Sequence, residues 1–276
     1  MSARPFFIVS SGRSGTAMLH KVLAAAGNVD MHHEYMVQIL QPLAVRAYHG
    51  LISGAEAARV LMQTHVAAIR YCDADFWGDS SNKLSWLIPE LSGLLPDARF
   101  VHLVRDGRKV TGSYFRKLGD ECYDDRSTRI LAHHLSAPDT VPPPPPEKKY
   151  WWPQARPDSP WAAEFSSFSQ FERIAWHWCE INQVILDALT CLPAARQVFV
   201  RLEDLYEQPE TLYDLLDFLE LRRSPDLVEL FHRPHNVNRP EDRLLTADET
   251  AAFARIAAPM MQRLGYDERT EYVVNY

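Results

Sequence analysis

Runs of apolar residues alternate along the chain with polar turns and with segments of helical spacing. Residues 6–9 are four consecutive apolar residues, and residues 98–104 and 198–202 are similar short runs rich in Val, Leu and Phe. Runs of this length, bounded by turn residues, predict buried strands. Residues 30–35 are a second short strand or a loop, and residues 76–82 are a turn or the end of a strand.

Helical spacing of apolar residues fills most of the remaining chain. The longest such segment, residues 167–192, alternates steps of three and four, which predicts one buried stripe along a helix. The stripe consists of Phe168, Phe171, Ala175, Trp178, Asn182, Ile185 and Leu189. The other predicted helices cover residues 16–26, several pieces of 36–71, 84–95, a segment from about Lys109, 209–219 and 247–264. Strands that alternate with helices are typical of a three-layer α/β/α fold with a central parallel sheet, which binds ligands at the carboxyl ends of its strands.

Residues 119–165 depart from this pattern, and their composition suits neither a core strand nor a core helix. Five consecutive prolines, residues 142–146, are stiff and extended. The aromatic residues that follow are Tyr150, Trp151, Trp152 and Trp161. Their density favours a lid or an acceptor-binding insertion over a disordered linker, and clamping of this loop onto the core is an equal alternative. We therefore expect a single domain, residues 1–276, that carries one Pro/Trp-rich insertion.

Composition narrows the class of protein. The chain has 276 residues, 46% of them hydrophobic, which is enough for a substantial core. The net charge of -7 disfavours a general nucleic-acid surface but allows a local basic pocket. The four cysteines are scattered without a CxxC motif, so we expect a reduced, cytoplasmic protein. A strand that begins at residue 6 leaves no room for a signal peptide, and no apolar run approaches the roughly 20 residues that span a bilayer.

The turn at residues 10–15, Ser-Ser-Gly-Arg-Ser-Gly, is the first candidate site. It joins a strand to a helix that starts near Thr16, so its N–H groups and the positive end of the helix dipole can cradle an anion. A plain strand–helix turn is the alternative. The loop is not a Walker A motif, because position 10 is not glycine and Gly15 is followed by Thr16 without a lysine. There is also no obvious acidic strand end to hold magnesium, so an ordinary ATP kinase is disfavoured.

A second candidate motif follows the predicted strand 98–104. Arg105 leaves the strand end directly, and Ser113 lies eight residues later, about two turns into the next helix. An arginine and a hydroxyl in this arrangement can hold a separate phosphate group. The alternative is that Arg105 pairs with Asp106 or caps the sheet. Because both motifs follow strands directly, we expect them to be neighbours in space.

Together the two motifs resemble those of the sulfotransferases that use 3′-phosphoadenosine 5′-phosphosulfate (PAPS). Residues 11–16 are similar to that family's 5′-phosphosulfate loop, and residues 104–113 are similar to its 3′-phosphate motif, with the Arg-to-Ser spacing intact. Residues 200–210 resemble a later strand-and-turn signature, and residues 256–266 resemble the C-terminal helix. Only residues 119–165 lie outside the resemblance. It implies a P-loop NTPase-like sulfotransferase fold, closest to the bacterial and tyrosylprotein-sulfotransferase-like branch.

The resemblance implies an enzyme that transfers the sulfuryl group of PAPS to a hydroxyl or amine of an acceptor and releases 3′-phosphoadenosine 5′-phosphate (PAP). Arg13 is placed to stabilise the charge that grows on the bridging phosphate oxygen. Glu34 is the expected general base, with His33 and His32 as rivals. The residues implied to bind the nucleotide are Ser11, Gly12, Arg13, Ser14, Gly15, Thr16 and Ala17 in the loop, with Arg105 and Ser113 at the 3′-phosphate.

The sequence also departs from the family pattern. Met18 stands where cytosolic members have an adenine-stacking tryptophan, and Leu202 stands where many have tyrosine. Ser80 falls where a lysine of the family reaches the sulfate, and Lys83 follows three residues later. The further candidates for contact with the transferred group or the acceptor are His33, Ser81, Lys83 and Trp152, and those for the C-terminal phosphate contact are Arg239 and Arg243.

Two other classes of function stay open at this point. The chain could be a nucleotide or small-molecule kinase that uses the first loop for ATP, or a catalytically silent PAP-binding protein. The histidines of residues 133–134 and 232–235 lack metal-ligand spacing, so we expect no metal. We expect a small-molecule or glycan acceptor, no nucleic-acid partner and no membrane span.

Overall fold

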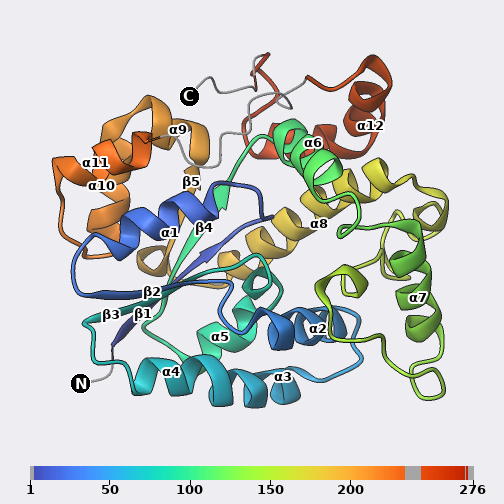
Figure 1. Ribbon diagram of the computed structural model, residues 1–276, viewed down its shortest axis with the longest axis horizontal. Coiled ribbons are helices and arrows are strands. Elements are labelled where there is room, and N and C mark those ends of the chain that lie inside the picture. Colours follow the sequence, from blue (N-terminus) through green and yellow to red (C-terminus); the bar gives the residue numbers. More distant parts are fainter. Residues whose placement is uncertain (1–2, 234–243, 271, 273–276) are drawn as a thin grey trace.

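The computed structural model describes residues 3–233, 244–270 and 272. In this part of the chain, five parallel strands form one sheet in the order β2-β3-β1-β4-β5 (Figure 1). The strands are β1 (Arg4–Val9), β2 (Val29–His33), β3 (Phe76–Ser80), β4 (Arg99–Val104) and β5 (Gln197–Arg201). The predicted α/β class with a parallel central sheet is confirmed. Of the two segments that were ambiguous in the sequence, residues 30–35 overlap strand β2, which starts at Val29, and residues 76–82 contain strand β3.

Alternating side chains of the strands face two layers of helices. Phe6 and Ile8 of β1 pack toward one layer, and Phe7 and Val9 pack toward the other. The first layer consists of α1 (Thr16–Ala24), α9 (Leu202–Glu207), α10 (Pro209–Phe218) and α11 (Pro225–His232). The second consists of α2 (Val37–Tyr48), α3 (Gly54–Leu61), the π-helix η1 (Met62–Val66), α4 (Ala67–Arg70), the 3-10 helix η2 (Leu84–Trp86), α5 (Ile88–Leu94) and α8 (Gln170–Thr190). In Figure 1, α10 and α11 lie at the upper left, and α3 and α4 lie along the bottom.

A third apolar cluster joins α6 (Gly107–Lys117), α8 and α12 (Ala247–Arg263) to the insertion. All seven residues of the predicted stripe are buried; six lie on α8, and Phe168 lies just before it, because the helix starts at Gln170. The single helix predicted over residues 84–95 is instead η2 followed by α5, whose first turn holds Pro89. Pro89 lacks the N–H that a continuous helix would need, so the chain restarts there.

The insertion at residues 119–165 is folded onto the core. It contains α7 (Asp125–Ser136), a helix that was not predicted and that the Asp124 carboxylate caps by accepting bonds from two backbone N–H groups. The indoles of Trp151 and Trp152 are buried, and their Nε1 atoms donate to the carbonyls of Pro145 and Glu121, both at 2.7 Å. These tryptophans therefore clamp the insertion, which was one of the two alternatives. Two short 3-10 helices, η3 (Lys148–Tyr150) and η4 (Phe165–Ser167), complete it, and a third, η5 (Ala194–Arg196), precedes β5.

Two further features concern the described residues. None of their helices combines the length and the apolar character that crossing a bilayer requires. The four cysteines are all free thiols.

Candidate active site

The loop after β1 is a preformed anion cradle. Gly12 and Gly15 have φ angles of 78° and 85°, and Arg13 between them has a φ of 54°. Gly15 precedes the first residue of α1 without a side-chain cap, and the first turn of α1 contains no acidic residue. The backbone N–H groups at this helix start are therefore available to an anion. The Oγ atoms of Ser11 and Ser14 lie 3.0 Å apart, and the Ser14 hydroxyl donates to the Gly12 carbonyl, which fixes the loop.

The two glycines are required by space as well as by backbone angle. A Cβ atom on Gly15 would lie 2.5 Å from Cδ1 of Leu202, and one on Gly12 would lie 2.0 Å from the hydroxyl of Tyr114. Both contacts are far inside van der Waals distance. The loop therefore lies against α9 on one side and α6 on the other.

Replacement of Gly15 by alanine is expected to lower the free energy of unfolding by more than about 1 kcal/mol, because a positive φ and a clash act together. Thermal unfolding would measure the effect. Gly93→Ala is the matched control, because a Cβ atom added to Gly93 in α5 would have no neighbour within 4 Å. Wild-type stability in Gly15→Ala would contradict this expectation.

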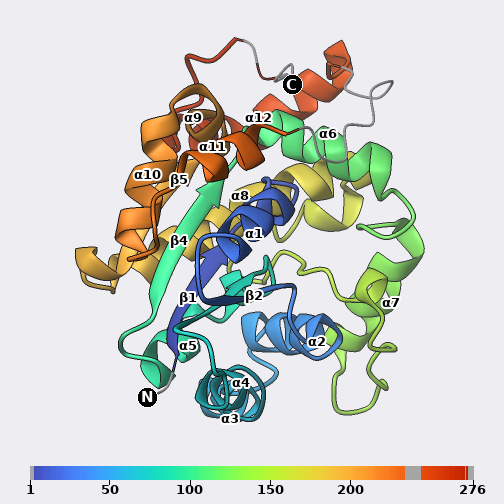
Figure 2. The ribbon, with the colours of Figure 1, turned by 60° about the vertical axis from the view of Figure 1, so that its left-hand side comes forward.

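The turn after β4 lies beside this loop, as predicted. β1 pairs directly with β4 (Figure 2). Nη1 of Arg105 donates to the Arg13 carbonyl at 3.1 Å, so the second motif holds the backbone of the first. The carboxylate of Asp106, which follows Arg105, caps α6 and forms an ion pair with the guanidinium of Arg108 at 2.7 Å.

Buried groups fix the turn from behind. The backbone N–H of Asp106 donates to Oε1 of Glu203 at 3.0 Å, and Trp178 Nε1 donates to the Arg105 carbonyl at 3.3 Å. Glu203 is 3% exposed, and its other oxygen accepts a 2.7 Å bond from the hydroxyl of Tyr266. Burial and the Glu203 carboxylate raise the pKa of Tyr266 well above its ordinary value, so this hydroxyl remains a donor. Glu203 lies within a family signature in the sequence, but its supporting role was not predicted.

A cleft of about 270 Å³ lies above both motifs. Its lining includes Arg105, in the turn that precedes α6, and then Lys109, Ser113 and Lys117 of α6, each four residues after the one before. The basic residues of the lining are Arg13, Lys21, Arg105, Lys109, Lys117 and Lys148, and Glu34 is the one carboxylate among the described residues that line it. A strongly positive cleft thus lies within a chain of net charge -7. Lys21, Lys109, Lys117 and Lys148 were not predicted as site residues, although the four-residue spacing from Arg105 was a usable signal for Lys109 and Lys117.

Arg13 connects the two motifs. Its side chain is exposed in the cleft, and its Nε donates to the hydroxyl of Ser113 at 3.0 Å. The predicted leaving-group cation and the predicted 3′-phosphate hydroxyl therefore touch each other. Met18, Leu202 and Tyr206 add less polar surface to the cleft on the α1 and α9 side.

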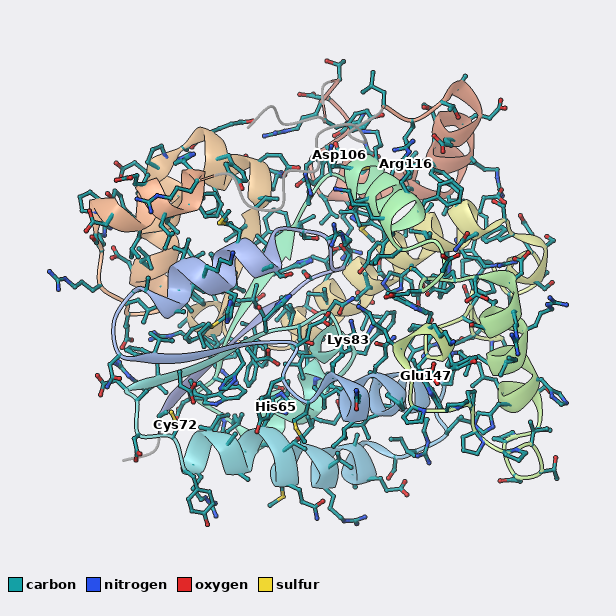
Figure 3. All side chains as sticks on the ribbon, viewed as in Figure 1. His65, Cys72, Lys83, Asp106, Arg116 and Glu147 are labelled. Carbon is teal, nitrogen blue, oxygen red and sulfur yellow. The ribbon has the colours of Figure 1, made fainter. Side chains whose placement is uncertain are left out.

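Glu34 lies in the turn that follows β2. Its own φ of 56° and the φ of 53° at Met36 make this a tight, unusual turn. The end of strand β3 holds this turn by two hydrogen bonds. The N–H of Glu34 donates to the Ser80 carbonyl, and the N–H of Tyr35 donates to Oδ1 of Asp79 at 3.3 Å. Asp79 is fully buried and lies 3.4 Å from Nε2 of His65, a residue of η1 that Figure 3 labels. The fold thus positions Glu34 from three separate elements.

Two ammonium groups face the Glu34 carboxylate. Nζ of Lys83 lies 2.8 Å from Oε1, and Nζ of Lys148 lies 3.9 Å from Oε2. Burial alone would raise the pKa of Glu34, but the two lysines outweigh it and lower the pKa below its ordinary value. Burial lowers the pKa of Lys83 to about 8, against the opposing effect of Glu34. Lys83 also donates to the Asn82 side chain, Asn82 to the Tyr114 hydroxyl, and Tyr114 to the Ser11 carbonyl, so hydrogen bonds link Glu34 to the anion cradle.

The remaining predicted residues are divided between cleft and core. His33 lines the cleft, and its Nδ1 lies 3.0 Å from the Ser80 carbonyl and 2.8 Å from the Ser80 Oγ. In the tautomer that donates from Nδ1 to this carbonyl, Nε2 is the basic nitrogen. His32 points instead toward Asp30 and the indole of Trp77.

The other candidates lie in the core beneath the cleft or outside the described residues. Ser81 is buried, and its hydroxyl accepts a hydrogen bond from the N–H of Lys83. Trp152 is 4% exposed beneath the cleft, with Nζ of Lys83 5.8 Å from its ring centroid. Arg239 and Arg243 lie outside the described residues.

Comparison with known proteins shows which family and which solved structures the chain is similar to. Residues 5–136, which contain both motifs and Glu34, match the model of the sulfotransferase family. Among solved structures, the sulfotransferase domain of the Synechococcus PCC 7002 olefin synthase is similar, with a TM-score of 0.53, 16% identity and coverage of 94% of this chain and 95% of that chain. The sulfotransferase STF9 of Mycobacterium avium gives a TM-score of 0.51 at 13% identity and covers 95% and 77%. No curated protein sequence matches the chain.

The resemblance to the sulfotransferase family is therefore confirmed for residues 5–136, and the chain has the sulfotransferase fold. The family match ends at Ser136, the last residue of α7, before the part of the insertion that carries Lys148. That lysine is thus contributed by a segment outside the matched region.

Proposed function

We propose that this protein transfers the sulfuryl group of PAPS to a hydroxyl, or an amine, of an acceptor and releases PAP. The single observation that supports this best is the cleft itself, in which a glycine-bounded cradle, Arg13 and Arg105 lie in the same lining as one carboxylate, Glu34. PAPS has anionic groups at its 5′ and 3′ positions, so a site with two adjacent anion-binding motifs suits it. The preformed loop, with no room for a Cβ at Gly12 or Gly15, fits close approach of a phosphate group.

In the proposed reaction, the acceptor oxygen forms a bond to sulfur while the bond from sulfur to the bridging phosphate oxygen breaks. The electron pair of the broken bond stays on the phosphate oxygen, and Arg13 with the loop N–H groups stabilises it. The acceptor proton goes to the Glu34 carboxylate, which Lys83 keeps ionised and oriented. Arg105 and Ser113 hold the 3′-phosphate. Met18, Leu202 and Tyr206 border the space for the adenine ring.

Calorimetry with PAP tests the nucleotide assignment. We expect binding by the wild type, a loss of about tenfold to about a hundredfold in affinity for Arg105→Ala, and a loss of about tenfold or less for Ser113→Ala, because the first removes a charged partner and the second a hydroxyl. Arg59→Ala, an exposed position on α3, is the control and should bind PAP normally. Unchanged affinity in both Arg105→Ala and Ser113→Ala would show that the 3′-phosphate lies elsewhere.

Activity and binding measurements on the same variants distinguish the two other classes of function, a kinase and a silent nucleotide-binding protein. Magnesium-dependent turnover of ATP without binding of PAP would indicate a kinase. Tight PAP binding with no sulfated product from any acceptor, and no effect of Glu34→Gln, would indicate a silent nucleotide-binding protein.

A further inference from the structure

The cleft has two distinguishable ends, because α6 runs along it. The N-terminal end of α6 lies next to α9, where the N–H of Asp106 binds Glu203. Lys117 is the last residue of α6, which has 11 residues and is therefore about 16 Å long. Lys117 thus lines the end of the cleft opposite to α9. Lys148 lines the cleft as well and lies 3.9 Å from Glu34, the expected site of the acceptor hydroxyl.

The positive charge at this second end exceeds what the protein itself neutralises. Lys117 forms no ion pair with any residue that the structure describes, and it lies one turn beyond Ser113, the last predicted contact to the nucleotide. Glu34 is already bound at 2.8 Å by Lys83, so the more distant Lys148 adds a further charge. At this end of the cleft, the ammonium groups of Lys83, Lys117 and Lys148 therefore outnumber the single carboxylate, that of Glu34.

Lys148 is held in place rather than left on a free loop. The amide nitrogen of Gln41 in α2 donates to the carbonyls of Lys148 and Trp151, at 3.0 and 2.7 Å. Burial of the Trp151 indole anchors the same segment. Figure 3 labels Glu147, the neighbour of Lys148, on the insertion, and Lys83 nearer to the sheet. Because the backbone of Lys148 is already ordered, only its side chain loses conformational entropy when it binds an anion.

We propose that Lys117 and Lys148 bind an anionic group of the acceptor. This inference rests on the proposed function. The substrates are then hydroxyl compounds that also carry a carboxylate, phosphate or sulfate, with the hydroxyl at Glu34 and the anion against the two lysines. The insertion determines acceptor specificity by supplying one of these lysines. A neutral hydroxyl compound would leave Lys117 without an anionic partner among the described residues and Lys148 with only its 3.9 Å contact to Glu34.

The test uses matched probes on the protein saturated with PAP. The pairs are 4-hydroxyphenylacetate and its amide, glucuronate and glucose, and glycerol 3-phosphate and glycerol. Calorimetry measures binding of each probe to the PAP complex, and labelled PAPS measures turnover. We expect the anionic member of at least one pair to bind at least about tenfold tighter, as for a charge-assisted hydrogen bond. Whether a carboxylate or a phosphate is preferred follows from which pair responds.

Three variants complete the experiment. Lys117→Gln and Lys148→Gln should each reduce the preference for the anionic member and change PAP affinity less than twofold. Lys149→Gln is the control, because the ammonium of this neighbouring lysine pairs with Glu147 at 3.3 Å. A PAP complex that does not distinguish the members of any pair overturns the inference, as does a large loss of PAP affinity in Lys117→Gln or Lys148→Gln, which would assign these lysines to the nucleotide. Failure to bind PAP at all would instead reject the proposed function.

Discussion

Replacement of Arg13 by alanine is expected to lower kcat by about 10²- to 10³-fold, the effect of removing one preorganised group that stabilises developing negative charge. Arg13 is exposed in the cleft and has Ser113 as a hydrogen-bond partner, so its loss should disturb the fold little. The φ of 54° at this position is equally unfavourable for arginine and alanine, and backbone strain is therefore unchanged. Single-turnover sulfation of a working acceptor measures the chemical step, and calorimetry with PAP measures ground-state binding.

Arg13→Lys is the matched control for charge. An ammonium group can neutralise the leaving oxygen but lacks the planar fork of arginine, so we expect activity between those of the wild type and Arg13→Ala. The decisive comparison is between kcat and PAP affinity. If PAP affinity falls as much as kcat in Arg13→Ala, Arg13 contributes uniform binding and not stabilisation of the transition state.

The central part of this site could be predicted because it depends on local sequence. Residues 10–16 bring their own glycines, hydroxyls and helix start, and the strands on either side are short apolar runs that the sequence shows clearly. The spacing from Arg105 to Ser113 is likewise contained in one strand end and one helix. Pairing of β1 with β4 then brings the two motifs together.

The rest of the site depends on contacts between distant segments. Lys148 reaches Glu34 only because buried tryptophans and Gln41 of α2 fix a proline-rich segment that shows no helical or strand period. Glu203 holds the Arg105 turn across almost 100 residues of sequence, and a carboxylate after a strand does not reveal such a partner. The helix α7 was missed because the prolines that follow it dominated the composition of residues 119–165.

Replacement of Glu34 by glutamine is expected to lower kcat by about 10²- to 10⁴-fold, the usual contribution of a positioned general base. Glutamine has nearly the same shape and can still accept a hydrogen bond from Lys83, so PAP binding and folding should be retained. The measurement is sulfation of an acceptor at saturating PAPS, with PAP calorimetry as the check on the nucleotide site. His33→Gln is the matched variant, because His33 also lines the cleft and presents a basic Nε2. Full activity in Glu34→Gln with loss of activity in His33→Gln would transfer the role to the histidine.

The dependence of kcat/KM on pH distinguishes Glu34 from His33 in a second way, because Lys83 directly lowers the pKa of Glu34. Glu34 must be ionised to accept a proton, and its pKa is lowered, so activity should be lost only as the pH falls below the ordinary range of a glutamate. In Lys83→Met the nearest ammonium is gone and burial is opposed only by the more distant Lys148, so the pKa of Glu34 rises and the acidic limb of kcat/KM moves to higher pH. A merely structural role for Lys83 would reduce activity without moving this limb. A wild-type limb near about pH 6.5 that Lys83→Met leaves in place would point to a histidine base and would remove Glu34 from the mechanism.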